Sequence, residues 1–75
     1  MSPASFRKFR GRSQAQFAIE LGLSERSKGY ISRLEAGATP WPLHLALRLE
    51  KISDGMVPAA SICAQAAELV SEARP

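Results

Sequence analysis

The sequence predicts an all-α fold, a compact five-helix bundle that forms one domain over residues 1–75. Apolar residues recur at helical spacing in several segments, and each segment lies between residues that start and stop helices. No stretch alternates apolar and polar residues for long enough to predict a strand. A chain of this length has room for one small core.

We expect the first helix to run from Pro3 to about Arg10. Ser2 can cap it, and a proline fits the first helical turn, where no backbone N–H is needed. Phe6 and Phe9 are expected to face inward, and Gly11 to end the helix.

The second helix is expected from Gln14 to Leu21, because Ser13 and Gln16 form a capping box. The serine hydroxyl can accept from the backbone N–H of residue 16, and the glutamine side chain can reach back. Gly22 then supplies a residue that turns with positive φ at little cost. The inward residues of this helix are Phe17, Ala18 and Leu21.

A third helix is expected from about residue 27 or 28 to 36, a fourth from 42 to 52 and a fifth from 58 to 73. Gly37 is a natural stop for the third, and Ser-Asp-Gly at 53–55 for the fourth. The fourth helix has an apolar arc wider than the ordinary stripe of about 100°, so it must be covered from two directions. Glu50 falls inside that arc, and the sequence suggests no partner for it.

The fifth helix is amphipathic. One face is polar, with Ser61, Gln65, Glu68 and Glu72. The opposite stripe contains Ala59, Ile62, Cys63, Ala66, Leu69, Val70 and Ala73. That stripe can fold back onto the preceding helix, pair with a second subunit, or do both. Cys63 is expected to act as a small buried hydrophobe.

Residues 13–37 carry a spaced pattern: Gln14, Ala18, Gly22-Leu23-Ser24, Ile31-Ser32, Leu34-Glu35 and Gly37. At these positions the chain resembles the Cro/repressor family of phage and bacterial helix-turn-helix regulators, also called the xenobiotic-response-element type. The resemblance covers roughly residues 3–55. It implies a lambda-repressor-like DNA-binding domain whose helix near residues 27–36 enters the major groove.

The chain departs from the family pattern in one place. Eight residues separate Gly22 from Ile31, where the family has about five. We expect the three additional residues to lengthen the loop and to bring Arg26 and Lys28 towards the phosphate backbone. The alternative is that they extend the third helix by one turn at its N-terminus.

Helical geometry separates two faces of the third helix, with Ile31 and Leu34 on the buried side and Tyr30 beside them. The outward face is built from Gly29, Ser32, Arg33 and Ala36. Its small residues allow the helix backbone to come close to the floor of a DNA groove. The candidate DNA-binding residues are Gln14, Arg26, Ser27, Lys28, Gly29, Tyr30, Ser32 and Arg33.

For three of these residues the sequence suggests a specific role and an alternative to it. Arg33 can pair with guanine O6 and N7, although an exposed arginine can also pair with its own neighbours. Tyr30 is expected to be half-buried with its hydroxyl in water, or else to contact a base or sugar. The resemblance implies a phosphate contact for Gln14, which otherwise lies in a solvated first turn. The family glutamate at Glu35 is structural, and we expect it to bind a nearby arginine or a backbone donor.

Charge is concentrated in the first half of the chain. Residues 1–37 hold seven lysines and arginines and three glutamates, a net charge of +4, whereas residues 38–75 have a net charge of −1. A positive half that also carries the two-helix pattern is typical of a phosphate-binding face. The alternative is that the basic residues only keep a small domain soluble.

Other classes of function have little support. One histidine and one cysteine give no metal-ligand spacing, and there is no glycine-rich phosphate loop or catalytic triad, so we expect no enzyme, cofactor or metal. No apolar run approaches the roughly 20 residues that span a bilayer. A single cysteine and the lack of an apolar segment after the basic N-terminus indicate a cytoplasmic protein.

The sequence therefore predicts a duplex-DNA-binding transcriptional regulator, a Cro-like repressor that reads a palindromic operator as a homodimer. One alternative is an antitoxin-type regulator whose C-terminal helix also binds a protein partner. Another is a domain with the same fold that uses the groove-facing surface to bind protein.

Overall fold

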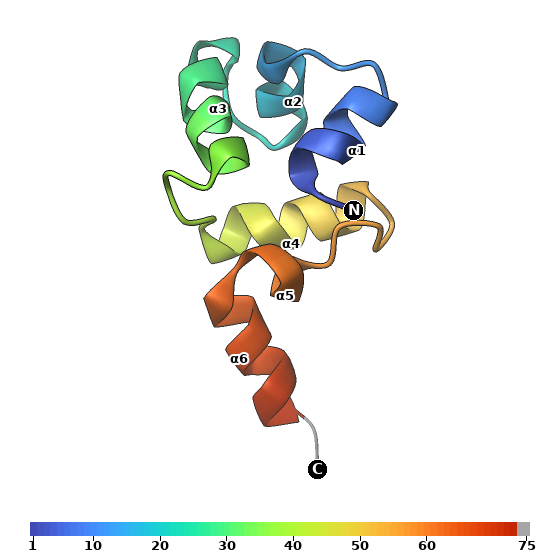
Figure 1. Cartoon of the computed structure of the whole chain (residues 1–75), viewed down its shortest axis with the longest axis vertical. Helices are drawn as coiled ribbons and strands as arrows, with labels where there is room; N and C mark the ends of the chain where they lie inside the picture. Colours follow the sequence, from blue (N-terminus) through green and yellow to red (C-terminus); the bar gives the residue numbers. More distant parts are fainter. Residues whose placement is uncertain (74–75) are drawn as a thin grey trace. The chain divides into compact units, whose positions relative to one another are not determined.

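A computed structural model describes the backbone of residues 1–73 and the side chains of residues 1–69, and this part of the chain contains no strand. The all-α prediction is confirmed. The elements in chain order are α1 (Pro3–Phe9), α2 (Gln14–Glu20), the 3-10 turn η1 (Glu25–Ser27), α3 (Lys28–Ala36), α4 (Leu43–Ile52), α5 (Ala59–Ile62) and α6 (Ala64–Ala73) (Figure 1).

The chain divides into two compact units, Met1–Thr39 and Pro40–Pro75. The first, unit 1, contains α1, α2, η1 and α3. The second, unit 2, contains α4, α5 and α6. Each unit is described by itself.

The capping residues of unit 1 form the expected hydrogen bonds. The Ser2 hydroxyl accepts from the backbone N–H of Ser5 at 3.1 Å. The Ser13 hydroxyl accepts from the N–H of Gln16 at 3.1 Å, and the Gln16 side chain accepts from the N–H of Ser13 at 2.8 Å. Both bonds of the predicted capping box are therefore present, and they fix the start of α2.

The core of unit 1 consists largely of the apolar residues that helical spacing assigned to it. The buried side chains are Phe6, Phe17, Ala18, Leu21, Ile31 and Leu34. Helix α2 contacts both α3 and η1. Gly22, with φ of 85°, turns the chain out of α2 after its last core residue.

The prediction for Phe9 is wrong, because its side chain is 73% exposed. The buried residues of α1 are Pro3 and Phe6, and the side chain of Arg7 is also largely buried. Arg10 lies over the Phe6 ring, 5.3 Å from its centroid, and also forms an ion pair with Glu20 at 2.7 Å. Phe9 is not among the side chains of α1 that pack inward.

A nearly buried polar network joins the three helices of unit 1. Arg7 of α1 donates two hydrogen bonds to the Glu35 carboxylate of α3, from Nε at 2.7 Å and from Nη2 at 3.1 Å. Gln14 of α2 donates its side-chain amide to the same carboxylate at 3.1 Å. The arginine also donates to the backbone carbonyl of Arg12 at 3.0 Å. The expected structural role of Glu35 is confirmed, and its partners are Arg7 and Gln14.

In unit 2, α4 packs against both α5 and α6. Its residues Leu45, Ala46 and Leu49 are buried, whereas Leu47 remains 48% exposed, so the apolar arc of α4 is only partly covered. Glu50, for which the sequence suggested no partner, accepts a hydrogen bond from the backbone N–H of Ala59 at 2.9 Å. It thus caps the start of α5 from a different helix.

The expected single helix over residues 58–73 is interrupted at Cys63. This residue has extended backbone angles, φ −131° and ψ 117°, which end α5 after one turn and start α6 in a new direction (Figure 1). No glycine or proline marks the break. Because both segments contact α4, packing rather than local sequence sets it. Cys63 is buried, as expected. Three residues assigned above to the two faces of the fifth helix, Val70, Glu72 and Ala73, have side chains outside the described residues.

Replacing Arg7 with Met should lower the free energy of unfolding by about 3 kcal/mol, because a carboxylate that is nearly buried loses its charged partner. The side chains of Arg7 and Glu35 are only 13% and 7% exposed. The double variant Arg7→Met/Glu35→Leu should recover much of that loss, since it leaves no unpaired charge. Urea denaturation measures both. A loss below about 1 kcal/mol in the single variant would mean that the pair behaves as an exposed one.

Replacing Glu50 with Ala should destabilise the chain by about 1 kcal/mol, because the first N–H of α5 loses its acceptor. Glu50→Gln is the matched control, since its side-chain oxygen can still accept from Ala59. Thermal unfolding followed by circular dichroism compares the two. Equal losses in both variants would show that the charge of Glu50, rather than the cap, is what matters.

Candidate nucleic-acid interface

The segment between α2 and α3 is lengthened, as expected, but its last three residues are helical rather than an open loop. Residues 21–24 are irregular, with a turn at Leu21 and Gly22, and Glu25–Ser27 form the 3-10 turn η1, which leads directly into α3 at Lys28. The additional residues therefore add a tight turn to the start of α3, close to the alternative of an N-terminal extension. None of the three is buried. Seven residues, 21–27, thus connect α2 to α3, which is more than the three or four of a standard helix-turn-helix turn.

Helix α3 has the two faces that its sequence predicts. Ile31 and Leu34 are buried, with exposures of 0% and 2%. The residues on the other side, Gly29, Ser32, Arg33 and Ala36, are all exposed. Three of these four are small, so the backbone of α3 is accessible along this face.

The hydroxyl groups at the start of η1 and α3 are not used as helix caps. Ser24 and Ser27 occupy the N-cap positions, but neither side chain forms a capping hydrogen bond. By contrast, Ser2 and Ser13 cap α1 and α2 with their hydroxyls. Ser24, which was not among the candidate residues that we derived from the sequence, is exposed.

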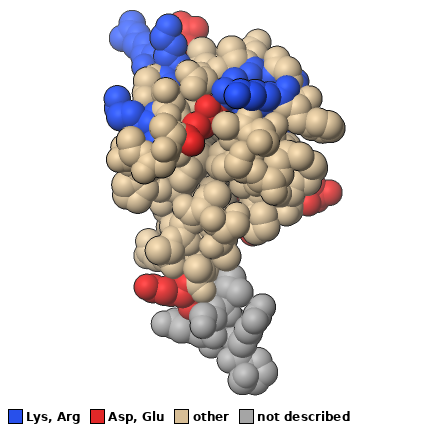
Figure 2. Space-filling model, viewed as in Figure 1, with Lys and Arg blue, Asp and Glu red and all other residues tan. Residues whose placement is uncertain are grey.

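Six of the seven lysine and arginine side chains of unit 1 form two groups, and Lys8 is exposed outside both. Arg7, Arg10 and Arg12 pair with Glu35 and Glu20. The second group, Arg26, Lys28 and Arg33, is exposed and forms no ion pair with the residues that the structure describes. Figure 2 shows several of the lysine and arginine side chains on one face of the molecule.

Gln14 lies half-buried at the first position of α2, and its amide N–H is bonded to Glu35. Its side chain is therefore held in place and does not extend into a solvated first turn. Its fixed amide has a second N–H and an oxygen that this bond does not use.

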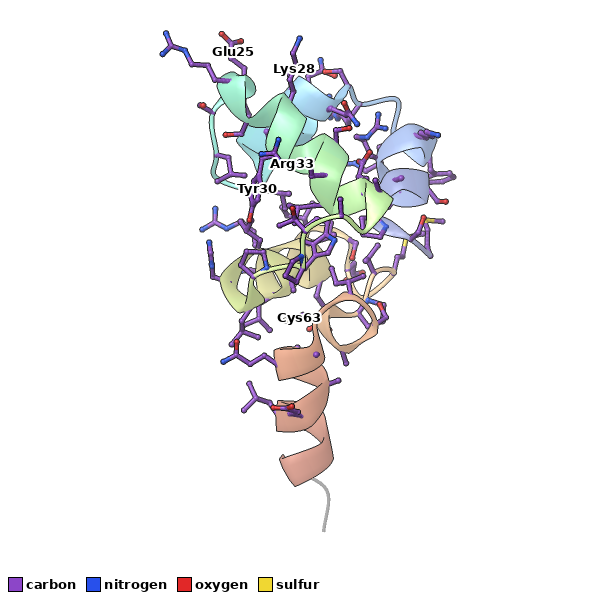
Figure 3. The ribbon with its side chains drawn as sticks, turned by 60° about the vertical axis from the view of Figure 1, so that its left-hand side comes forward. Glu25, Lys28, Tyr30, Arg33 and Cys63 are labelled. Carbon is purple, nitrogen blue, oxygen red and sulfur yellow. The ribbon has the colours of Figure 1, made fainter. Side chains whose placement is uncertain are left out.

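Tyr30 and Arg33 lie next to each other on one side of α3, and Lys28 lies closer to the start of the helix (Figure 3). The guanidinium carbon of Arg33 is 6.0 Å from the centroid of the Tyr30 ring. The ring is half-buried, as expected. Arg33 thus has an aromatic neighbour on its own helix, and it forms no ion pair with a described residue.

Within residues 1–69, whose side chains the structure describes, no group of histidine, cysteine, aspartate or glutamate side chains is arranged to hold a metal ion. None of the helices within residues 1–73 is both long and apolar enough to cross a membrane.

Comparison with known proteins gives no family assignment. No protein-family model matches the chain, and no curated protein or solved structure matches it significantly.

Proposed function

We propose that the chain is a helix-turn-helix protein that binds duplex DNA in a sequence-specific way and regulates transcription. In this proposal α2 and α3 are the two helices of the motif, residues 21–27 form its lengthened turn, and α3 enters the major groove.

The observation that carries the proposal is the exposed face of α3. A helix can come especially close to the base edges of the major groove when its outward side chains leave its backbone accessible. Gly29, Ser32 and Ala36 do so, and Arg33 adds one side chain with paired donors on the same face. The opposite face is anchored by two fully packed residues, so this orientation of α3 is fixed within unit 1.

The charge distribution supports the same partner. The carboxylates of Glu20 and Glu35 are engaged by the arginines of α1 and the segment after it. Glu25 is the one remaining acidic residue of unit 1. The cations of η1 and α3 are thus left with little compensation, which favours contact with phosphates.

We further propose that the protein acts as a homodimer on a palindromic site. Support comes from α6, which extends away from α4 in Figures 1 and 3. Its Leu69 is 51% exposed, although it belongs to the apolar stripe of this helix. A second copy would bury that surface.

The same feature supports a second candidate, an antitoxin-type regulator. In that case the exposed part of α6 binds an unrelated protein, and the DNA-binding face remains in use. Co-purification of a distinct partner with the full chain would favour this candidate over a simple homodimer.

Replacing Arg33 with Ala should cost about 1–3 kcal/mol on the preferred duplex and much less on a scrambled one, because base contacts carry sequence information. Arg26→Gln is the control for a phosphate contact. It should weaken binding to both duplexes and reduce the dependence of log affinity on log salt by about one.

Fluorescence anisotropy at several salt concentrations measures these effects. Equal losses on both duplexes for Arg33→Ala would exclude a base-reading role. Failure of the unmodified protein to bind any duplex at low salt would reject the proposed function.

Replacing Leu69 with Glu should reduce dimer formation and operator affinity together, because a charge is placed in the apolar contact. Ala64→Glu is the matched control, since Ala64 is exposed on another side of the same helix. Light scattering at micromolar concentration gives the mass of each variant. A monomer mass for the unmodified protein, with tight operator binding, would exclude the dimer.

A further inference from the structure

The Arg33 side chain leans back along α3 towards the start of the helix. Its Nη1 atom is 3.9 Å from the position that a Cβ atom would take at Gly29, and its Cζ atom is 6.0 Å from the Tyr30 ring centroid (Figure 3). These residues precede it by four and three positions. Long helical side chains lean in this direction, so the contact follows from the helix itself.

Gly29 and Tyr30 together favour this position of the guanidinium. Gly29 has no side chain to displace it, and Tyr30 offers an aromatic ring within the distance at which a cation is attracted. An arginine plane also stacks on an aromatic ring, which a lysine ammonium cannot do. At an exposed site such a contact changes an equilibrium constant about two- to fivefold.

We propose that Tyr30 is a positioning residue that orients Arg33 to read a guanine in the major groove. This inference rests on the proposed DNA-binding function. It assigns Tyr30 a role in selectivity, where the sequence offered only a packing residue or a direct base contact.

Guanine is the base that fits this geometry. Its O6 and N7 atoms are two adjacent acceptors in the major groove, and they match the parallel donors of one guanidinium. A held guanidinium loses less conformational freedom when it forms two such bonds than a freely rotating one does. A phosphate contact, by contrast, depends mainly on charge and gains little sequence selectivity from orientation.

The test compares Tyr30→Leu with Tyr30→Phe in the full-length chain. The probes are a duplex selected by the unmodified protein and the same duplex with 7-deazaguanine, which lacks the N7 acceptor, at the contacted guanine. The unmodified protein and Tyr30→Phe should prefer guanine to the same extent. Tyr30→Leu should lose about two- to fivefold of that preference, and Arg33→Ala should show none.

A second readout needs no DNA. The ring current of Tyr30 should shift the NMR signals of the Arg33 δ protons upfield in the unmodified protein and in Tyr30→Phe, but not in Tyr30→Leu. Thermal unfolding confirms that each variant is folded, and Arg33→Lys, which keeps the charge but not the plane, should resemble Tyr30→Leu in selectivity.

The possible failures are distinct. Undiminished guanine preference in folded Tyr30→Leu, or no ring-current shift in the unmodified protein, overturns the role of Tyr30 alone. Equal losses for Tyr30→Leu on every duplex, with a smaller salt dependence, make Arg33 a phosphate contact and also overturn it. If the unmodified protein binds no duplex, the proposed function fails, and the guanine-reading role fails with it.

Discussion

The ion pair between Arg7 and Glu35 is the interaction on which unit 1 depends. Glu35 lies in the last turn of α3, where the helix dipole disfavours a negative charge, and it is almost fully removed from water. Its carboxylate is stable there because Arg7 and Gln14 supply three hydrogen bonds from two other helices. One carboxylate thereby connects α1, α2 and α3, and any change in the rotation of α3 about its axis would break these bonds.

That constraint bears directly on the candidate DNA-binding face. With Glu35 directed inward alongside Ile31 and Leu34, the residues Ser32 and Arg33 are held on the outside. The ion pairs of unit 1 also leave its charge uneven, because Glu20 and Glu35 are both used by arginines of the N-terminal segment. Packing and charge therefore favour the same face of α3 for contact with an anionic partner.

Features encoded by a few neighbouring residues could be predicted from the sequence. The capping box of Ser13 and Gln16 and the buried pair on α3 depend on local spacing, and both are present. Features that depend on packing could not. The break at Cys63 has no local signal, and the partner of Glu50 lies nine residues away on another helix. The outward position of Phe9 could not be predicted either, because helical spacing alone does not show which side chains of α1 pack against the rest of unit 1.

The central claim is that the exposed face of α3 reads a duplex sequence, and the most direct test is selection of bound sequences from random duplex DNA by the full-length protein. The account predicts enrichment of one motif with two-fold symmetry, whose half-sites lie about one helical turn apart, 10–10.5 base pairs. It also predicts that a guanine in each half-site is no longer enriched in a selection with Arg33→Ala. A pool that shows no enriched sequence after repeated rounds would contradict the account.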